Sequence, residues 1–401
     1  MNPKRSKYET VFRNLFFFTG YKLSDLKDTE NQVLVILEKA IPPKCPRCGS
    51  VHGHIEESYT RIVRDLNLRQ KQCHIEFEEN KIRCSCGYRG IEYLDFVRPY
   101  SRCTKYLEDA VAFCTFRMTI SDASALWDLD WKTVKEIDMK SIRDKMIDLK
   151  TLNPTMIGVD EIAYMKGHHY LTIVRDITAR RVIWIGFKRK TETLDEFFKE
   201  LGPEKSKRIE VCCMDMWDPY IASVKKNTLA DIVFDKFHII KKVNEALDKI
   251  RKSVFAQSDD ATRKEMKHKR FLILHRRKNL IEEEDIESLE QLLESNKPLY
   301  TAYILKEEIA DIFDDVDESR ETVRLEQWFK NVSDSGIKEF LPVVSMIQSY
   351  LYGVLNYFKH RLTNAGSEGF NNKINVIKRA AFGFRDIEYF KLKIFQRCGG
   401  I

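Results

Sequence analysis

Three acidic residues, far apart in the chain, stand where carboxylates could do chemistry. Asp160 ends the apolar run MIGVD and Asp215 ends VCCMD, whereas Glu368 is the one acid in TNAGSEGFNNKIN, in a basic part of the chain. Burying an unpaired charge is costly, so an acid at these strand ends is an unusual choice for packing. Convergent carboxylates do supply the hard oxygen ligands that divalent cations prefer.

Two strand acids and one helix acid form a suitable ligand set for two-metal phosphoryl transfer. In such sites one ion activates a water or hydroxyl and the other stabilises the leaving oxygen, with the ions about 3.5–4 Å apart. A close trio of carboxylates repels at neutral pH until Mg²⁺ or Mn²⁺ compensates it. Taken alone, Glu368 could instead be a first-turn acid favoured by the helix dipole. The two matching strand acids favour the catalytic interpretation.

Further acids lie near these positions. Glu161 follows Asp160 directly, and because side chains alternate along a strand we expect it to point to the opposite face of the sheet. Asp235 ends another buried strand shortly before His238. These two residues are either a second shell behind the metal ligands, a contact to substrate or a structural His–Asp pair.

The elements that must position the acids can be read from the residues around them. Five apolar runs predict strands, and amphipathic runs after the third, fourth and fifth predict helices. This order, three strands and then alternating helix and strand, predicts an α/β sheet of ribonuclease-H type. The strand runs span residues 155–164, 169–177, 181–187, 209–215 and 230–235. Residues 257–341 are mostly charged and helical, which indicates an insertion.

The stretch around Glu368 has the pattern of a helix that begins near Asn364. Its apolar stripe has helical spacing and consists of Phe370, Ile374, Ile377 and Ala381. Glu368 is then in the first turn and faces the sheet-edge acids. We expect the polar residues of this helix to contact DNA phosphates, namely Asn371, Asn372, Lys373, Asn375, Lys378 and Arg379.

Four of the ten cysteines form two pairs, in CPRCG and in CSC. Strand-like runs separate the pairs, and this arrangement predicts a zinc ribbon with one structural Zn²⁺ held by Cys45, Cys48, Cys84 and Cys86. The metal then supplies folding energy, because the segment has few large apolar residues. Buried free thiols are the alternative. Because CSC is less usual than CxxC, one of its members could be replaced by His52, His54, Cys73 or His74.

Residues 104–148 have a helical pattern, with Ser121 and Asp130 as expected N-caps. Two short helices joined by a tight turn predict a helix-turn-helix, and an ordinary helical linker is the alternative. The expected DNA contacts at the start of the second helix are Trp131, Lys132, Thr133 and Lys135.

The composition is that of a globular chain of several domains, with 401 residues, 43% hydrophobic residues and a net charge of +7. No basic-then-apolar leader begins it, and the most apolar long helix, 341–358, is interrupted by polar residues. We therefore expect a cytoplasmic protein with no membrane partner. The run 261–279 carries eight basic residues, which indicates either DNA contact or a solvated helix face.

These blocks together resemble the DDE transposases of bacterial insertion sequences, of the ISL-three type. The resemblance runs nearly end to end and is most specific in FDKFHIIKKVNEALDKIR and TNAGSEGFNNKINVIKRAAFGFRDIEYFKLKI. It implies a multidomain α/β protein whose ribonuclease-H-like core, with a helical insertion, follows a zinc ribbon and a helix-turn-helix. The implied acid trio is Asp160, Asp215 and Glu368, with two Mg²⁺ or Mn²⁺ ions. The close spacing in CSC departs from the family pattern.

The implied activity is cleavage at the terminal inverted repeats of a mobile element, followed by strand transfer into target DNA. A homodimer on double-stranded DNA and association with the bacterial nucleoid are further expectations. The alternatives are a domesticated, non-catalytic DNA-binding regulator and a structure-specific ribonuclease-H-type nuclease. We expect five domains. They are an N-terminal element with the ribbon (1–100), the helix-turn-helix (101–150), the first part of the catalytic domain (151–256), the helical insertion (257–341) and the rest of the catalytic domain with the last acid (342–401).

Overall fold

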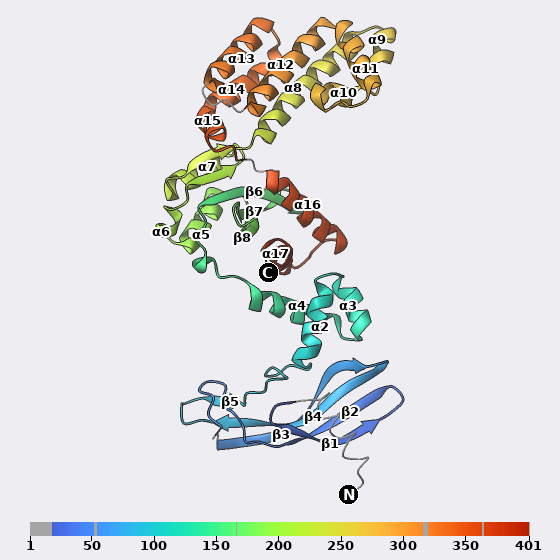
Figure 1. Cartoon of the computed structure of the whole chain (residues 1–401), viewed down its shortest axis with the longest axis vertical. Helices are drawn as coiled ribbons and strands as arrows, with labels where there is room; N and C mark the ends of the chain where they lie inside the picture. Colours follow the sequence, from blue (N-terminus) through green and yellow to red (C-terminus); the bar gives the residue numbers. More distant parts are fainter. Residues whose placement is uncertain (1–17, 52–53, 166, 316–319, 363–364, 401) are drawn as a thin grey trace. The chain divides into compact units, whose positions relative to one another are not determined.

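The computed structural model describes residues 18–51, 54–165, 167–315, 320–362 and 365–400 (Figure 1). The chain divides into two compact units, Met1–Lys145 and Met146–Ile401. The finer division into five domains stays a prediction. No helix in the described part is long and apolar enough to cross a membrane.

The first unit begins with a five-stranded sheet in the order β1-β2-β4-β3, with β5 paired to β4. The strands are β1 (Tyr21–Asp28), β2 (Gln32–Lys39), β3 (His54–Leu68), β4 (Lys71–Arg83) and β5 (Arg89–Ile91). Strands β3 and β4 are the two runs predicted between the cysteine pairs. The β1–β2 hairpin was not predicted from the sequence, and it helps to give the sheet an apolar core of its own. Phe18, the described residue of the aromatic run FRNLFFF, packs in that core with its ring centroid 4.7 Å from that of Phe96.

Three helices complete the first unit, α2 (Lys105–Thr115), α3 (Ile120–Trp127) and α4 (Trp131–Lys145). The prediction that Ser121 caps α3 is wrong. Thr119 is the cap, because its hydroxyl accepts the backbone N–H of Asp122 while the Asp122 carboxylate accepts the backbone N–H of Thr119. Asp130 does cap α4, where its carboxylate accepts the backbone N–H of Lys132 at 2.9 Å.

The second unit contains a mixed sheet in the order β10-β9-β6-β7-β8. Its strands are β6 (Met156–Met165), β7 (His169–Asp176), β8 (Arg181–Phe187), β9 (Val211–Met214) and β10 (Asp231–Phe234). They correspond to the five runs predicted as strands. Strands β6, β7 and β8 are antiparallel neighbours, whereas β9 and β10 run parallel to β6.

Helices cover both faces of this sheet. Helices α5 (Thr191–Leu201) and α7 (Asp218–Asn227) pack on one face, with Phe197 and Tyr220 fully buried against Val159. Helices α16 (Ala365–Ala380) and α17 (Ile387–Cys398) pack on the other face of β6, β7 and β8. Helix α15 (Leu351–His360) lies against β10, and the short helix α6 (Pro203–Ser206) follows α5.

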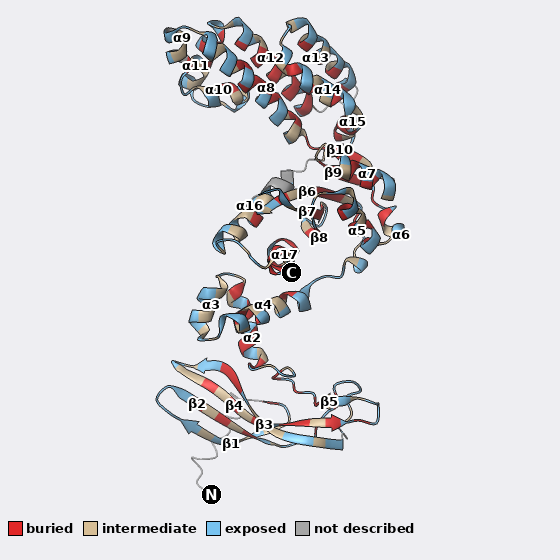
Figure 2. Cartoon of the chain, turned by 180° about the vertical axis from the view of Figure 1, so that it is seen from behind, coloured by how far each residue is buried: buried red, intermediate tan, exposed pale blue. Residues whose placement is uncertain are grey.

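The predicted insertion is wholly helical in its described residues. Helix α8 (Lys236–Gln257) leads from the sheet into this helical group (Figure 1), whose buried residues face one another (Figure 2). The group contains α9 (Asp260–Met266), α10 (Arg270–Leu274), α11 (Glu283–Glu294), α12 (Lys297–Asp314), α13 (Glu321–Ser335) and α14 (Leu341–Ser349).

Much of the basic run 261–279 neutralises acids of the same helical group. Arg276 forms ion pairs with Glu307 and Asp314, each at 3.0 Å, and Arg277 pairs with Glu290. These pairs form because α11 and α12 bring their own carboxylates to this face, and DNA contact by the run stays a prediction.

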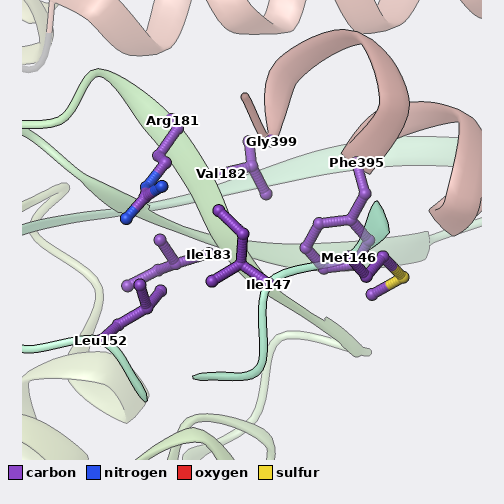
Figure 3. Close-up of a pocket in the computed structure, with 8 residues that line it drawn as sticks. All are labelled: Met146, Ile147, Leu152, Arg181, Val182, Ile183, Phe395 and Gly399. Atoms are coloured by element: carbon purple, nitrogen blue, oxygen red, sulfur yellow. The ribbon is translucent and has the colours of Figure 1, made fainter. Parts of the chain in front are cut away.

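The segment that begins the second unit packs on the end of its sheet. Met146, Ile147 and Leu152 line a small crevice with residues of β8 and α17, among them Ile183 and Phe395 (Figure 3). The volume open to the centre of a water-sized sphere there is about 10 Å³, which is roughly the least that can hold one water molecule. The crevice is therefore a packing contact and not a ligand site.

Candidate metal centres

The four paired cysteines meet at one point of the first unit. The four Sγ atoms all lie within 4.8 Å of one another, and they belong to Cys45, Cys48, Cys84 and Cys86. The Sγ atoms of Cys45 and Cys86 are 3.7 Å apart, and those of Cys48 and Cys84 are 3.5 Å apart. Four converging thiols are the usual ligand set of a structural zinc site.

Two tight turns aim these sulfurs. In the first, the N–H of Gly49 donates to the carbonyl of Cys45 at 3.0 Å, and in the second, the N–H of Gly87 donates to the carbonyl of Cys84 at 3.0 Å. Both glycines have positive φ angles, +74° and +86°. The second turn closes one residue sooner, and this is how the unusual CSC spacing still brings both thiols to the cluster.

The alternative ligands lie elsewhere or outside the described residues. Cys73 is fully buried in the apolar core of the sheet, where burial raises the pKa of its thiol to about 12. His74 and His54 lie on β4 and β3 and are not part of the cluster, and His52 lies outside the described residues. Within the cluster, a hydrogen bond from the backbone of Cys86 is the main cause that lowers the pKa of Cys84 to about 6.

The second cluster lies in the sheet of the second unit, at the point where β9 ends beside β6. Strand β9 pairs with β6 as far as Gly158 and then stops, whereas β6 continues to Met165 beside β7. Asp160 therefore lies within its strand and not at the strand end, which corrects the sequence interpretation. Asp215 follows the last residue of β9 and so comes level with Asp160. The end of β9 creates the opening in which the two carboxylates meet.

Glu161 also belongs to this cluster, although its side chain lies on the opposite face of β6 from Asp160, as strand alternation predicts. Carboxylate oxygens of Asp160, Glu161 and Asp215 all lie within 4.8 Å of one another. Asp160 is bound by Asn371 on one face of β6, and Glu161 is bound by Arg189 on the other. Beyond the end of β9 no strand lies between them, so Asp215 can approach side chains from both faces.

The surroundings of Asp160 raise its pKa. Burial is the main cause, and the charge of Asp215 is the second. Two hydrogen bonds oppose this effect, from the N–H of Glu161 at 2.7 Å and from the side-chain amide of Asn371 at 2.8 Å. The pKa of Glu161 is raised by the same kinds of cause, burial first and then the charges of Asp215 and Asp160. The cluster is thus an electrostatically unfavourable arrangement that a cation would relieve.

His238 contacts the cluster through Asp215. Its Nδ1 lies against a carboxylate oxygen of Asp215, and this contact is the main cause that raises the pKa of His238. Asp235 has a different position, since its carboxylate accepts the N–H of Phe237 at 3.1 Å and caps α8. A His–Asp contact therefore exists, but its acid is Asp215.

Helix α16 carries Glu368 in its first turn, and the Glu368 side chain lies outside the described part of the structure. The predicted apolar stripe packs on the sheet, with Ile374 fully buried and Phe370 and Ile377 partly buried beside it. Asn371 binds Asp160 directly, so its amide contributes to the acid site, and its contact with DNA stays a prediction. Ala381 lies just past the end of the helix.

A buried arginine fixes the beginning of α16. Arg175, on β7, is 4% exposed, and its guanidinium lies 5.1 Å from the ring centroid of Phe370. A Cβ atom at Gly366 would come within 2.8 Å of the arginine Nη1. The first turn of α16 therefore lies directly on Arg175, whose charge also lowers the pKa of Asp160.

The remaining predicted DNA contacts are distributed over two helices. Trp131 and Lys132 are exposed at the beginning of α4, with Thr133 and Lys135 half-buried beside them. On α16, Asn372, Lys373 and Arg379 are exposed, whereas Lys378 donates to the backbone carbonyl of Ala163 at 3.1 Å. Asn375 is half-buried.

Comparison with known proteins shows the class to which this architecture belongs. Residues 157–394 match a family profile described as transposase, and residues 41–86 match the zinc-finger of transposase IS204/IS1001/IS1096/IS1165. The transposase for insertion sequence element IS1001 of Bordetella parapertussis is 32% identical over 355 residues, 87% of each chain. The transposase for IS1557 of Mycobacterium tuberculosis is 25% identical over 374 residues, 86% of this chain and 83% of that one.

The chain belongs to the ISL3 family of DDE transposases. Its second cysteine pair lies within the stretch matched by the zinc-finger profile, and both strand acids lie within the transposase match. Glu161, Asn371 and Arg175 are the residues at the acid site that the sequence analysis missed or assigned elsewhere. A signal for Glu161 existed in its position next to Asp160, but the shortness of β9 was needed to interpret it.

Proposed function

We propose that the protein cleaves DNA at the terminal inverted repeats of an insertion sequence and joins the freed ends to target DNA. The observation that carries this proposal is the meeting of the Asp160 and Asp215 carboxylates at the end of β9 in a chain of a transposase family. The sheet supports a ribonuclease-H-like core, since three antiparallel strands are followed by two parallel ones in the order β10-β9-β6-β7-β8.

Divalent metal fits the residues present. Three carboxylates within 4.8 Å of one another offer hard oxygen ligands, and the raised pKa values of Asp160 and Glu161 are consistent with a site that favours added positive charge. Two bound Mg²⁺ or Mn²⁺ ions would activate the attacking hydroxyl or water and stabilise the leaving oxygen. The chain's own part is to hold Asp160 by the Asn371 amide and Asp215 by His238.

Glu368 completes the proposed acid trio from the first turn of α16. The support is the position of this turn, because Asn371, three residues further along, already touches Asp160. His238 is proposed to support the metal site through its contact with Asp215. Asp235 is proposed to support it by capping α8, the helix that carries His238. The exposed polar residues of α16 are the proposed contacts to the DNA backbone.

The first unit is the proposed reader of transposon ends. Helices α3 and α4 form the proposed helix-turn-helix, since Asp128 takes a left-handed conformation at the turn and α4 presents Trp131 and Lys132 to solvent. The cysteine cluster holds about one structural zinc per chain. Two chains act together, because two ends of one element must be joined.

Cleavage of end-sequence DNA in the presence of Mg²⁺ tests the proposal. The wild-type protein should leave 3′-hydroxyl nicks at the terminal repeats, and Glu368→Gln should abolish them while binding of the same DNA survives. Glu388→Gln, which changes a first-turn acid of the next helix, is the matched control and should cut normally. If Glu368→Gln cut as well as wild type, the assignment of the trio would be wrong.

A further inference from the structure

One carboxylate oxygen of Glu161 accepts a hydrogen bond, and the other has no donor among the described residues. Its Oε1 accepts from Arg189 Nη1 at 3.1 Å. Its Oε2 is buried, and within the described residues no hydrogen-bond donor reaches it. The carboxylate as a whole lies within 4.8 Å of those of Asp160 and Asp215. A buried carboxylate oxygen next to two other acids is placed as a cation ligand would be.

We propose that Glu161 is an additional ligand of the divalent metal held by Asp160 and Asp215. This inference rests on the proposed function, since it assigns one more residue to the same metal site. It extends the acid set beyond the two strand acids and Glu368. Glu161 contributes from β6 itself, so its position does not depend on how α16 is placed.

Arg189 binds only Oε1 of Glu161 and does not block Oε2. Its guanidinium lies 4.2 Å from the ring centroid of Tyr170 and 4.6 Å from that of Trp217. The indole N–H of Trp217 also donates to the backbone carbonyl of Arg189 at 3.1 Å. Held between two rings, the guanidinium stays on Oε1 and leaves Oε2 without a partner among the described residues.

A purely structural role makes a different prediction. If Glu161 served only as the partner of Arg189, then removing either member of the pair would disturb the site in the same way. If Glu161 binds metal, then its loss weakens metal binding, whereas loss of Arg189 removes a competing positive charge. The two explanations therefore differ in the effect of the arginine variant.

Direct titration of Mn²⁺ into the full-length, zinc-loaded protein distinguishes them, with free Mn²⁺ measured by electron paramagnetic resonance. We expect Glu161→Gln to weaken Mn²⁺ binding by at least about tenfold, since even residues behind the ligands contribute about 10–100-fold. Glu210→Gln is the matched control, because this exposed acid lies at the other end of β9 and should bind Mn²⁺ as wild type does. Arg189→Met should bind Mn²⁺ at least as tightly as wild type.

Three outcomes would overturn the inference or its basis. Unchanged binding in Glu161→Gln, together with lost binding in Asp160→Asn, removes Glu161 from the site and leaves the proposed function intact. An equal loss in Glu161→Gln and Arg189→Met shows a structural pair. Unchanged binding in Asp160→Asn shows that the acid cluster is not the metal site, and the proposed function then fails. Thermal unfolding of each metal-free variant shows whether it is folded.

Discussion

The cysteine cluster and the acid cluster are built in opposite ways. Each cysteine pair is aimed by its own short turn, and Gly49 and Gly87 close these turns with local hydrogen bonds. The acids come from separate strands and meet only because β9 ends where Asp215 begins. The sulfur atoms can hydrogen-bond one another before metal arrives, as Cys45 does with Cys86 and Cys48 with Cys84, whereas buried carboxylates repel one another. The first site is thus expected to stabilise the fold through its metal, and the second to strain the fold until metal binds.

The largest expected effect is loss of a cysteine ligand. Cys84→Ser should reduce zinc from about one per chain to almost none and lower the unfolding temperature of the first unit. Structural zinc contributes about 10–16 kcal/mol of binding free energy in small fingers. The measured loss should be smaller here, because the sheet also has an apolar core. Elemental analysis and circular dichroism on heating provide the measurements.

The control for this experiment is another thiol of the same unit. Cys114→Ser changes a half-buried cysteine on α2 that is outside the cluster, so zinc content and unfolding should stay close to wild type. Full zinc retention by Cys84→Ser would exclude the cluster as the metal site.

The acid cluster should respond in the opposite direction. Burial and the charge of Asp215 raise the pKa of Asp160, so its ionised form disfavours the folded state. Metal-free protein should therefore become less stable as the pH rises from about 4, the unfolded carboxyl pKa, through the raised folded pKa. Asp160→Asn should remove this dependence, raise the stability of the metal-free protein near pH 7 and abolish Mn²⁺ binding. Thermal unfolding between pH 5 and 8, with and without Mn²⁺, measures both effects.

An outcome in which Asp160→Asn destabilises the metal-free protein would contradict the idea of strain at the acid cluster. Glu210→Gln, with the same loss of charge at the other end of β9, is the control and should show neither change.

The same contrast explains how far the sequence alone could lead. Cysteine spacing is a local pattern, so all four cysteines were predicted and all four meet. The strands of the second unit were also predictable, because long apolar runs rich in β-branched residues have few other uses. The hairpin β1–β2 was missed since YKLSDLKD, the sequence of β1, is largely exposed at a sheet edge and lacks that pattern.

The membership of Glu161 in the acid cluster was missed for a physical reason of a different kind. This membership follows from the length of a neighbouring strand that lies about fifty residues further along the chain. No pattern around Glu161 encodes that length. Likewise, the contact of Asn371 with Asp160 was not foreseen, because a polar helix face does not reveal which of its members touches the sheet.

The next effect concerns the helix that carries Glu368. Gly366→Ala would place a Cβ atom 2.8 Å from the buried Arg175 Nη1, so the first turn of α16 must shift. We expect a cost of about 1–3 kcal/mol, seen as reduced DNA cleavage more than as lost DNA binding. Gly369→Ala is the matched control in the same helix, because its Cβ would meet no atom within 4 Å. That variant should stabilise the helix by about 0.5–1 kcal/mol and cut normally. Equal activity of the two variants would argue against positioning through Arg175.

The smallest expected effect tests the local construction of the cysteine site. Gly87 has a φ angle of +86°, and its N–H closes the shorter of the two turns. Gly87→Ala should cost about 1–2 kcal/mol from left-handed strain while zinc still binds at about one per chain. Gly87→Asn should recover part of this loss, because asparagine enters the left-handed region more readily than alanine. Chemical unfolding of the zinc-loaded variants gives the order wild type, Asn and then Ala. If alanine and glycine were equally stable at this position, the turn would not constrain the second cysteine pair, and the local character of this site would have to be abandoned.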